Sequence, residues 1–203
     1  MSKIKKIAFL DVDGILLNFN KLVFQHLSSA HGIEIPKDYI PKSWNFTELT
    51  PKGKKYVPWK KIIGIDWASH VKPFNNAKSF LDKLKRKGYH IVLITRLDQS
   101  MQILRMENLI KHGLHYDEIY FNEDSQIKAD IMVTVLARYK PKEWIFADDK
   151  AASCLRVLDI KNKNSKVYSL EYPFNKSIIK NSPKELIWVK NEQELYQKIL
   201  KDS

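Results

Sequence analysis

The sequence of 203 residues contains a single cysteine, Cys154, so no intramolecular disulfide can form. The cysteine and the six histidines show no zinc-ligand spacing, which argues against a structural zinc module. No apolar run approaches the roughly 20 residues that a membrane-spanning helix needs. The apolar run near the N-terminus is too short for a signal peptide. We therefore expect a soluble protein in a reducing, cytoplasmic compartment, with no membrane partner.

Arginine is also scarce, with five residues, so lysine carries most of a formal net charge of +12 and a pI near 9.5. A basic field attracts phosphorylated ligands and nucleic acid. However, lysine-rich stretches such as KLKRKG and KNKNSK fall where helix ends and loops are expected, and solvated surface lysines explain them more simply. The charge alone therefore assigns no partner.

The second part of the chain has the pattern of an α/β domain. From about residue 75, amphipathic helical stretches alternate with short apolar runs, which is typical of a parallel sheet covered by helices. The expected helices are NNAKSFLDKLKRKG, QSMQILRMENLIKHG, KADIMVTVLARYK, KAASCLRVLDI and NEQELYQKIL, and the expected strands are YHIVLIT, DEIYFN, EWIFAD and KVYSLEY. The fold class that we predict is α/β, a Rossmann-like, doubly wound parallel sheet.

An insertion separates the first strand from these units. Residues 5 to 10 form a continuous apolar run that suits a strand buried on both faces of the same sheet. The next regular unit begins only at about residue 73, after a predicted helix near residues 16–30 and several proline-interrupted stretches. We therefore predict an α/β core formed by residues 1–15 and 73–203, with a small, mainly helical unit formed by 16–72.

Polar side chains follow the predicted strands at the points where these end. The carboxyl ends of parallel strands meet at one edge of a sheet, where ligands bind. The residues at this edge are Asp11 and Asp13 after the first strand, Thr95 and Arg96 after IVLI, Asp148 and Asp149 after WIFA, and Lys128 at the start of a helix.

Several carboxylates on one edge repel each other unless a cation lies between them. Oxygen ligands of this kind suit a hard divalent ion, so the pattern predicts Mg²⁺. A threonine hydroxyl and a lysine ammonium group then suit the oxygens of a phosphate. An aspartate such as Asp11 can attack phosphorus, and Asp13, two residues further on, can protonate the leaving oxygen.

These residues resemble the motifs of the haloacid dehalogenase (HAD) superfamily. FLDVDGILLNF resembles its first motif, VLITR its second, Lys128 its third and FADD its fourth, in the same order along residues 5–160. The resemblance implies the following roles: Asp11 as nucleophile and metal ligand, Asp13 as acid/base with its carbonyl on the metal, Thr95 and Lys128 as phosphate ligands, and Asp149 as metal ligand, with Asp148 acting through water or from behind the direct ligands. The second aspartate distinguishes phosphatases from dehalogenase-type members and so favours hydrolysis of a phosphate ester.

Some of these assignments have structural alternatives. Lys140 and Lys142 are alternatives to Lys128, although a cation is disfavoured in the first turn of a helix, and this favours a role for Lys128. One of the two aspartates after WIFA is expected to cap the following helix while the other faces the metal. Arg96 contacts either the phosphate or substrate, or forms a surface ion pair.

The insertion holds the residues that would choose a substrate. It is rich in aromatic residues, which either stack on a nucleobase or form the core of a small helical cap. They are Phe19, Phe24, Tyr39, Trp44, Phe46, Tyr56, Trp59 and Trp67. The cap length, the sequence WNF and the stretch Pro173, Phe174 and Asn175 after a core strand resemble the 5'(3')-deoxyribonucleotidase group. We therefore expect a small phosphorylated substrate, a nucleotide.

Two other functions stay open at this point. A polynucleotide 3'-phosphatase is suggested by the sequence ITR and by the positive charge, although a large cap usually excludes polymers. A catalytically silent binding protein on the HAD fold is the other, and the presence of every expected active-site residue argues against it. The sequence gives no indication of the oligomeric state.

Overall fold

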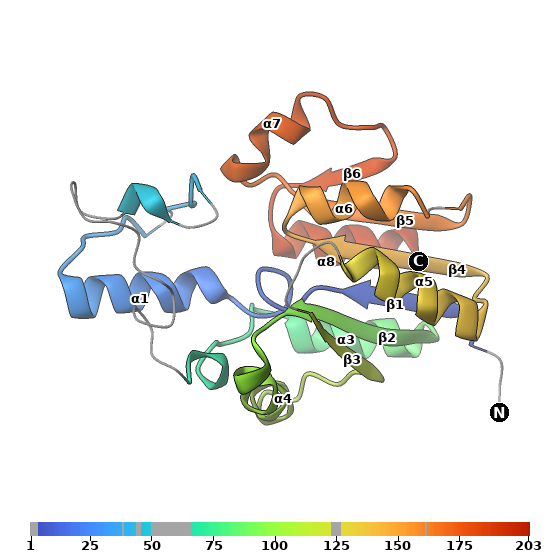
Figure 1. Ribbon diagram of the computed structural model, residues 1–203, viewed down its shortest axis with the longest axis horizontal. Coiled ribbons are helices and arrows are strands. Elements are labelled where there is room, and N and C mark those ends of the chain that lie inside the picture. The colour runs from blue at the N-terminus through green and yellow to red at the C-terminus, as the bar shows by residue number, and fades with distance from the viewer. Residues whose placement is uncertain (1–3, 38, 44–45, 50–65, 123–126, 161) are drawn as a thin grey trace.

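A six-stranded, all-parallel sheet forms the centre of the computed structural model, which describes residues 4–37, 39–43, 46–49, 66–122, 127–160 and 162–203 (Figure 1). The order across the sheet is β3-β2-β1-β4-β5-β6. The strands are β1 (Lys6–Leu10), β2 (Tyr89–Arg96), β3 (Glu118–Asn122), β4 (Glu143–Asp148), β5 (Ser165–Leu170) and β6 (Leu186–Val189). The predicted α/β fold class is confirmed.

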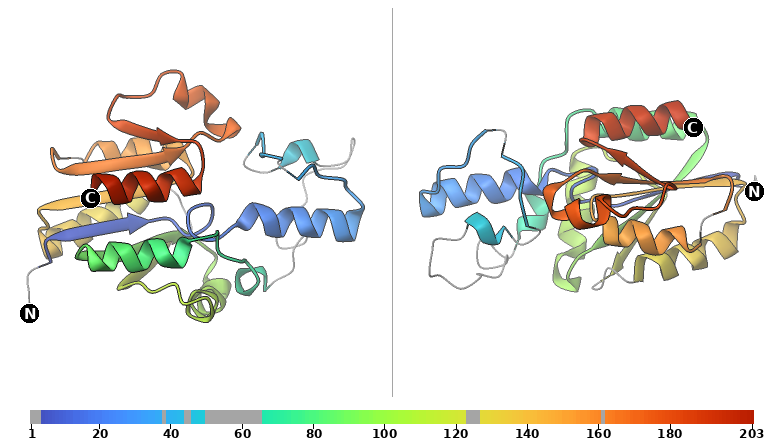
Figure 2. Two further views of the ribbon diagram at one scale, coloured as in Figure 1. Left: turned by 180° about the vertical axis from the view of Figure 1, so that it is seen from behind. Right: turned by 90° about the horizontal axis from the view of Figure 1, so that it is seen from above.

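Helices cover both faces of this sheet (Figure 2). One face carries α3 (Ala77–Arg86) and α8 (Glu192–Asp202), and the other carries α5 (Ile127–Tyr139) and α6 (Ala151–Leu158). Helix α4 (Gln102–Lys111) follows β2 and a 3₁₀ turn, η3 (Gln99–Met101). Because successive side chains of a strand point to opposite faces, β1 contributes to both hydrophobic cores: Ala8 and Leu10 to one, Ile7 and Phe9 to the other.

The register of β1 with its neighbours determines what lies at the edge of the sheet. Leu10, the last residue of β1, is level with Leu93 of β2 and Ala147 of β4. The backbone N–H of Asp11 donates to the carbonyl of Ala147 at 2.9 Å and continues this ladder by one residue. Asp11 is therefore level with Asp148, the last residue of β4, and both strands are buried on both faces.

Most helix and strand predictions agree with the structure, and a few details differ. The last helix is capped at its N-terminus, since Asn191 Oδ1 accepts from the N–H of Glu194 at 2.9 Å. The predicted helix NNAKSFLDKLKRKG begins only after its two asparagines, and the Asn76 side chain makes no capping hydrogen bond; its φ is 69°. Strand β6 and the short α7 (Lys176–Ile179) were not predicted.

The inserted segment lies beyond the carboxyl ends of the strands (Figure 1). Its described elements are α1 (Phe19–His31), η1 (Thr47–Leu49) and η2 (Trp67–Ser69). Helix α1 begins three residues later than predicted from Leu16, because Gly14 to Leu17 form a tight turn closed by a 2.8 Å hydrogen bond between Gly14 N–H and the Leu17 carbonyl.

Aromatic rings of this segment pack on one another. The ring centres of Phe24 and Phe46 are 5.8 Å apart, those of Phe24 and Tyr39 are 5.6 Å apart, and those of Phe19 and Trp67 are 4.9 Å apart. The described rings therefore contribute to a small core, which was the alternative to base stacking. The other aromatic residues of the prediction lie outside the described residues; they are Trp44, Tyr56 and Trp59.

In the described parts of the chain, no helix is both long enough and apolar enough to cross a membrane.

Candidate active site

Three buried carboxylates meet at the carboxyl edge of the sheet. Asp11, Asp148 and Asp149 each offer an oxygen, and these oxygens lie within 4.8 Å of one another. Asp11 directly follows β1, and Asp148 and Asp149 lie at the end of the neighbouring β4. The sheet therefore holds three like charges together where they are shielded from water, and such a group requires protons or cations to offset its charge.

Lys128 supplies one of these cations. Its Nζ lies 2.8 Å from Asp11 Oδ1 and 2.8 Å from Asp148 Oδ2, and its side chain is only 4% exposed. Burial disfavours the charged ammonium group, but the charges of Asp11 and Asp148 outweigh this effect and raise the pKa of Lys128. Lys140 and Lys142 are exposed, and the Lys142 N–H donates to the Lys5 carbonyl where β1 and β4 begin, at the end of the sheet opposite to the carboxylates. The structure thus places Lys128 in the site and both alternatives outside it.

The two aspartates of the FADD motif are held differently. Asp148 accepts from Lys128 at Oδ2 and from the backbone N–H of Lys150 at Oδ1, at 2.8 Å in both cases. Asp149 Oδ1 is buried and has no hydrogen-bond partner among the described residues. Asp148 is therefore the residue that braces the start of α6, while Asp149 has an oxygen left for another ligand.

A divalent cation fits this arrangement. The donors are all carboxylate oxygens, which is the set that Mg²⁺ prefers, and a buried oxygen without a partner is costly unless a ligand satisfies it. The residues that would hold the ion are Asp11 and Asp149, with Asp148 beside them.

Burial shifts the protonation of the site. Burial raises the pKa of Asp11 to about 7, although Lys128 opposes the shift, and the charge of Asp148 adds to it. Burial, followed by the charges of Asp148 and Asp11, raises the pKa of Asp149 well above its usual range. Without a cation, the carboxyl groups therefore tend to keep protons, and a bound cation would have to displace them.

Gly14 allows the first motif to approach Asp149 closely. Its φ is +85°, and a Cβ at this position would lie 2.4 Å from Asp149 Oδ2. A side chain here would overlap the carboxylate and also strain the backbone. The glycine of the DVDG sequence is therefore required by the packing of two motifs that are distant in the sequence.

Asp13, the second aspartate of the first motif, is paired with an arginine. Arg105 of α4 places its Nη2 2.9 Å from both Oδ1 and Oδ2 of Asp13, and the arginine side chain is fully buried. Burial raises the pKa of Asp13, and Arg105 partly offsets this rise. The sequence-based prediction did not include Arg105. The available signal was a charged residue on the apolar face of a helix, between Met101 and Leu109.

Thr95 and Arg96 end β2 next to the first motif. Thr95 is buried, whereas Arg96 is exposed. Thr95 therefore lies in the protein interior at the carboxyl end of β2, and Arg96 lies on the surface.

Asn175 holds the backbone next to Asp149 in place through hydrogen bonds of its side-chain amide. Its side-chain amide donates to the Asp149 carbonyl at 2.7 Å and to the Leu170 carbonyl at 2.9 Å, and its oxygen accepts from the Ala151 N–H at 3.1 Å. The stretch Pro173 to Asn175 is the one that resembles the 5'(3')-deoxyribonucleotidase group in the sequence. In this structure its asparagine ties β4, α6 and the turn after β5 together.

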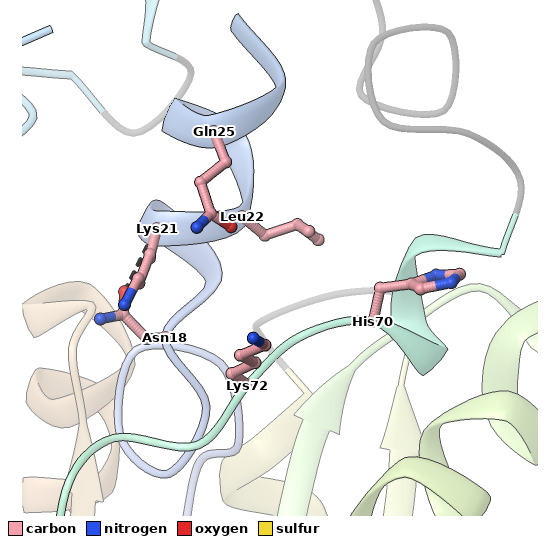
Figure 3. Close-up of a pocket in the computed structure, with 6 residues that line it drawn as sticks. All are labelled: Asn18, Lys21, Leu22, Gln25, His70 and Lys72. Atoms are coloured by element: carbon pink, nitrogen blue, oxygen red, sulfur yellow. Dashed lines mark hydrogen bonds between the residues drawn. The ribbon is translucent and has the colours of Figure 1, made fainter. Parts of the chain in front are cut away.

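A shallow depression lies between α1 and the chain that returns from the inserted segment (Figure 3). Lys21 and Lys72 give its rim a positive charge, and Asn18 Oδ1 accepts from the N–H of Lys21 at 3.0 Å. The remaining lining residues are Leu22, Gln25 and His70. None of the six comes from the strand ends, so the depression is separate from the carboxylate group.

No family model and no curated protein matches the sequence. Solved structures do match. A HAD family hydrolase from Deinococcus radiodurans R1, solved with phosphate and sodium bound, superposes with a TM-score of 0.63 at 11% identity, covering 99% of this chain and 97% of the other. The chain has the HAD fold. A D,D-heptose 1,7-bisphosphate phosphatase from B. bronchiseptica, solved with magnesium and phosphate, shares this HAD fold with a TM-score of 0.57 at 10% identity, covering 98% and 99%.

Proposed function

We propose that this chain is a Mg²⁺-dependent phosphomonoester hydrolase that acts through an aspartyl-phosphate on Asp11. The observation that carries the proposal is the environment of Asp11, whose carboxylate is buried beside Asp149 and within 2.8 Å of the Lys128 ammonium group. Phosphoryl transfer depends mainly on positioning and on neutralising negative charge, and this group of residues offers both.

In the first half of the reaction, an oxygen of Asp11 attacks phosphorus, and the bond between phosphorus and the ester oxygen breaks. Asp13 gives its proton to the departing oxygen, so the product leaves as an alcohol. Lys128 and Thr95 bind the non-bridging phosphate oxygens. The buried position of Lys128 strengthens its interaction with the negative charge of the phosphoryl group.

In the second half, a water molecule attacks the phosphorus of the aspartyl-phosphate. The carboxylate of Asp13 accepts the proton of this water, the bond to Asp11 breaks, and inorganic phosphate leaves. Asp11 and Asp149 would hold Mg²⁺ with Asp148 beside them. The chemistry that this ion supplies when bound is neutralisation of the clustered carboxylates and of the phosphate oxygens.

The substrate that we propose is a small phosphate ester, with a nucleoside monophosphate as the first candidate. Residues 16–72 would act as a cap over the core formed by 1–15 and 73–203, since the described part of this segment stands beyond the strand ends (Figure 1). Support for a nucleotide comes from the resemblance of WNF and of Pro173 to Asn175 to the nucleotidase group. The packing of Phe24 on Phe46 weakens the case that these two rings stack on a base.

Phosphate release from a panel of esters tests the proposal. The panel contains nucleoside monophosphates, sugar phosphates and 3'-phosphorylated oligonucleotides, each with Mg²⁺ and with a chelator. We expect turnover of small esters that requires Mg²⁺. Faster turnover of the oligonucleotides at low salt would favour the polynucleotide 3'-phosphatase instead, and no turnover of any ester would favour a binding protein.

Substitution of the nucleophile tests the covalent step. Asp11→Asn is expected to reduce turnover by at least about 10³-fold while leaving the circular dichroism spectrum unchanged. Asp82→Asn, which removes an exposed carboxylate of α3 paired with Lys78, serves as the control and should retain full activity. An active Asp11→Asn variant would exclude the aspartyl-phosphate.

A further inference from the structure

Arg105 is a buried arginine, and protein stability alone does not explain why an arginine occurs at this position. Its side chain is fully buried, yet only Nη2 has a hydrogen-bond partner among the described residues, while Nε and Nη1 have none. Burying a guanidinium group is costly, and replacing a buried ion pair by apolar residues is often neutral or stabilising. Protein stability alone therefore gives little reason for an arginine at this point of α4.

The partner of Arg105 is the residue whose direction matters most for proton transfer. Asp13 lies in the turn after β1, outside the ladder that fixes Asp11, and its backbone carries only an isolated bridge to Leu17. The single Nη2 of Arg105 contacts both carboxylate oxygens of Asp13 at 2.9 Å. This contact limits the rotation of the Asp13 side chain.

Arg105 is in turn held by the chain that returns from the inserted segment. Its guanidinium carbon lies 5.2 Å from the ring centre of Trp67 in η2, within the range of a cation–π interaction. One turn along α4, Asn108 donates to the Ser69 carbonyl at 2.6 Å, so the same helix binds η2 a second time. These contacts cover the guanidinium group and fix its position next to Asp13.

We propose that Arg105 is a positioning residue that holds the carboxyl group of Asp13 in the orientation needed for proton transfer, with Trp67 keeping the guanidinium group in place. This inference rests on the proposed phosphatase function. It assigns Arg105 no contact with the substrate, because Trp67 and α4 bury it.

The leaving group distinguishes this role from a general structural one. p-Nitrophenolate leaves without needing a proton, whereas an alkoxide does need one from Asp13. The parameter to measure is kcat/KM, because it reports the steps up to release of the alcohol. For Arg105→Met we expect kcat/KM to fall by about 10²-fold for an alkyl phosphate but by less than about 10-fold for p-nitrophenyl phosphate, in line with the usual contribution of a general acid.

Three further variants complete the experiment. Arg105→Lys keeps a charged nitrogen near Asp13 and should show the same substrate pattern with a smaller loss, so it also serves if Arg105→Met does not fold. Asn108→Ala loosens the attachment of η2 to α4, and so the contact of Trp67 with Arg105, and should show the same substrate pattern with a smaller loss. In an Asp13→Ala background, Arg105→Met should cause no further change in the ratio of the two kcat/KM values.

Equal losses for both esters in the Arg105 variants would overturn the inference while leaving the phosphatase function intact. A further change in the ratio when Arg105→Met is added to Asp13→Ala would also overturn it, because Arg105 would then act independently of Asp13. A wild-type protein that hydrolyses neither ester would instead refute the proposed function, and the inference with it.

Discussion

At the scale of single residues, a few neighbouring side chains and one glycine allow the three carboxylates to lie close together. Lys128 contacts Asp11 and Asp148, and Asn175 and Gly14 define the position of Asp149. Lys128 offsets the negative charge of Asp11 and Asp148, Asn175 holds the backbone of Asp149, and Gly14 leaves room for the Asp149 side chain.

Lys128→Met is expected to destabilise the metal-free protein strongly. The variant leaves Asp11 and Asp148 buried without their shared cation, and removing one partner of a buried ion pair typically costs about 3 to 5 kcal/mol. Denaturant unfolding of the metal-free protein at neutral pH measures this loss. Lys142→Met, at an exposed lysine near the opposite edge of the sheet, should change the free energy of unfolding by less than about 0.5 kcal/mol. Similar values for the two variants would contradict the bridging role of Lys128.

Gly14→Ala and Gly88→Ala separate backbone strain from a clash with Asp149. Their φ angles are +85° and +82°, so both variants should lose about 1 to 2 kcal/mol of stability through strain. Only the Cβ at Gly14 would meet Asp149, because nothing lies within 4 Å of the one at Gly88. We therefore expect the increase in melting temperature on adding Mg²⁺ to be smaller for Gly14→Ala and unchanged for Gly88→Ala. An undiminished increase for Gly14→Ala would show that Asp149 does not bind the ion.

At the scale of elements, the turn after β5 acts as a clamp on the end of β4. η4 (Pro173–Asn175) places Asn175 so that its amide joins the backbone of Leu170, Asp149 and Ala151 through three hydrogen bonds. These carbonyl and N–H groups are buried, so each would be left without its partner if the amide were removed.

Asn175→Ala should therefore affect both stability and metal binding. Loss of the buried hydrogen bonds is expected to cost about 2 to 4 kcal/mol in the free energy of unfolding, at about 1 kcal/mol or more for each bond. Release of the Asp149 backbone should also weaken Mg²⁺ binding, measured by calorimetric titration. The control is Asn191→Ala, which removes the exposed cap of α8 and should cost about 1 kcal/mol without changing Mg²⁺ affinity. Unchanged affinity in Asn175→Ala would limit the clamp to a structural role.

The elements also show why part of this site could be predicted from the sequence. Asp11 and Asp148 follow apolar runs that had to be central strands, and the ends of parallel strands meet at one edge, so their proximity followed from topology. Arg105 could not be found in this way, because it comes from a helix and its partner Asp13 lies 92 positions away in the sequence. Strand β6 was missed because its four residues are too few to show a period.

At the scale of the whole molecule, the buried carboxyl groups link folding to pH. The pKa of Asp11 is raised from 3.8 to about 7 in the folded chain. The folded state therefore binds this proton more tightly than the unfolded state does. The stability of the metal-free protein should consequently fall as the pH rises through this interval, with no further loss from Asp11 above it. The raised pKa of Asp149 adds a loss in the same direction.

Mg²⁺ should reverse this dependence, because the ion binds the ionised carboxylates and competes with their protons. We expect the melting temperature of the chelator-treated protein to be higher at about pH 5 than at about pH 8, and the increase caused by Mg²⁺ to be larger at the higher pH. Sodium chloride at equal ionic strength controls for screening of the net charge of +12. Asp149→Asn should abolish most of the Mg²⁺ effect, because it replaces the carboxylate that has an unpaired oxygen among the described residues. If Mg²⁺ and sodium chloride raised the melting temperature equally, or if the Mg²⁺ effect were the same at both pH values, the clustered carboxylates would not be the site of binding.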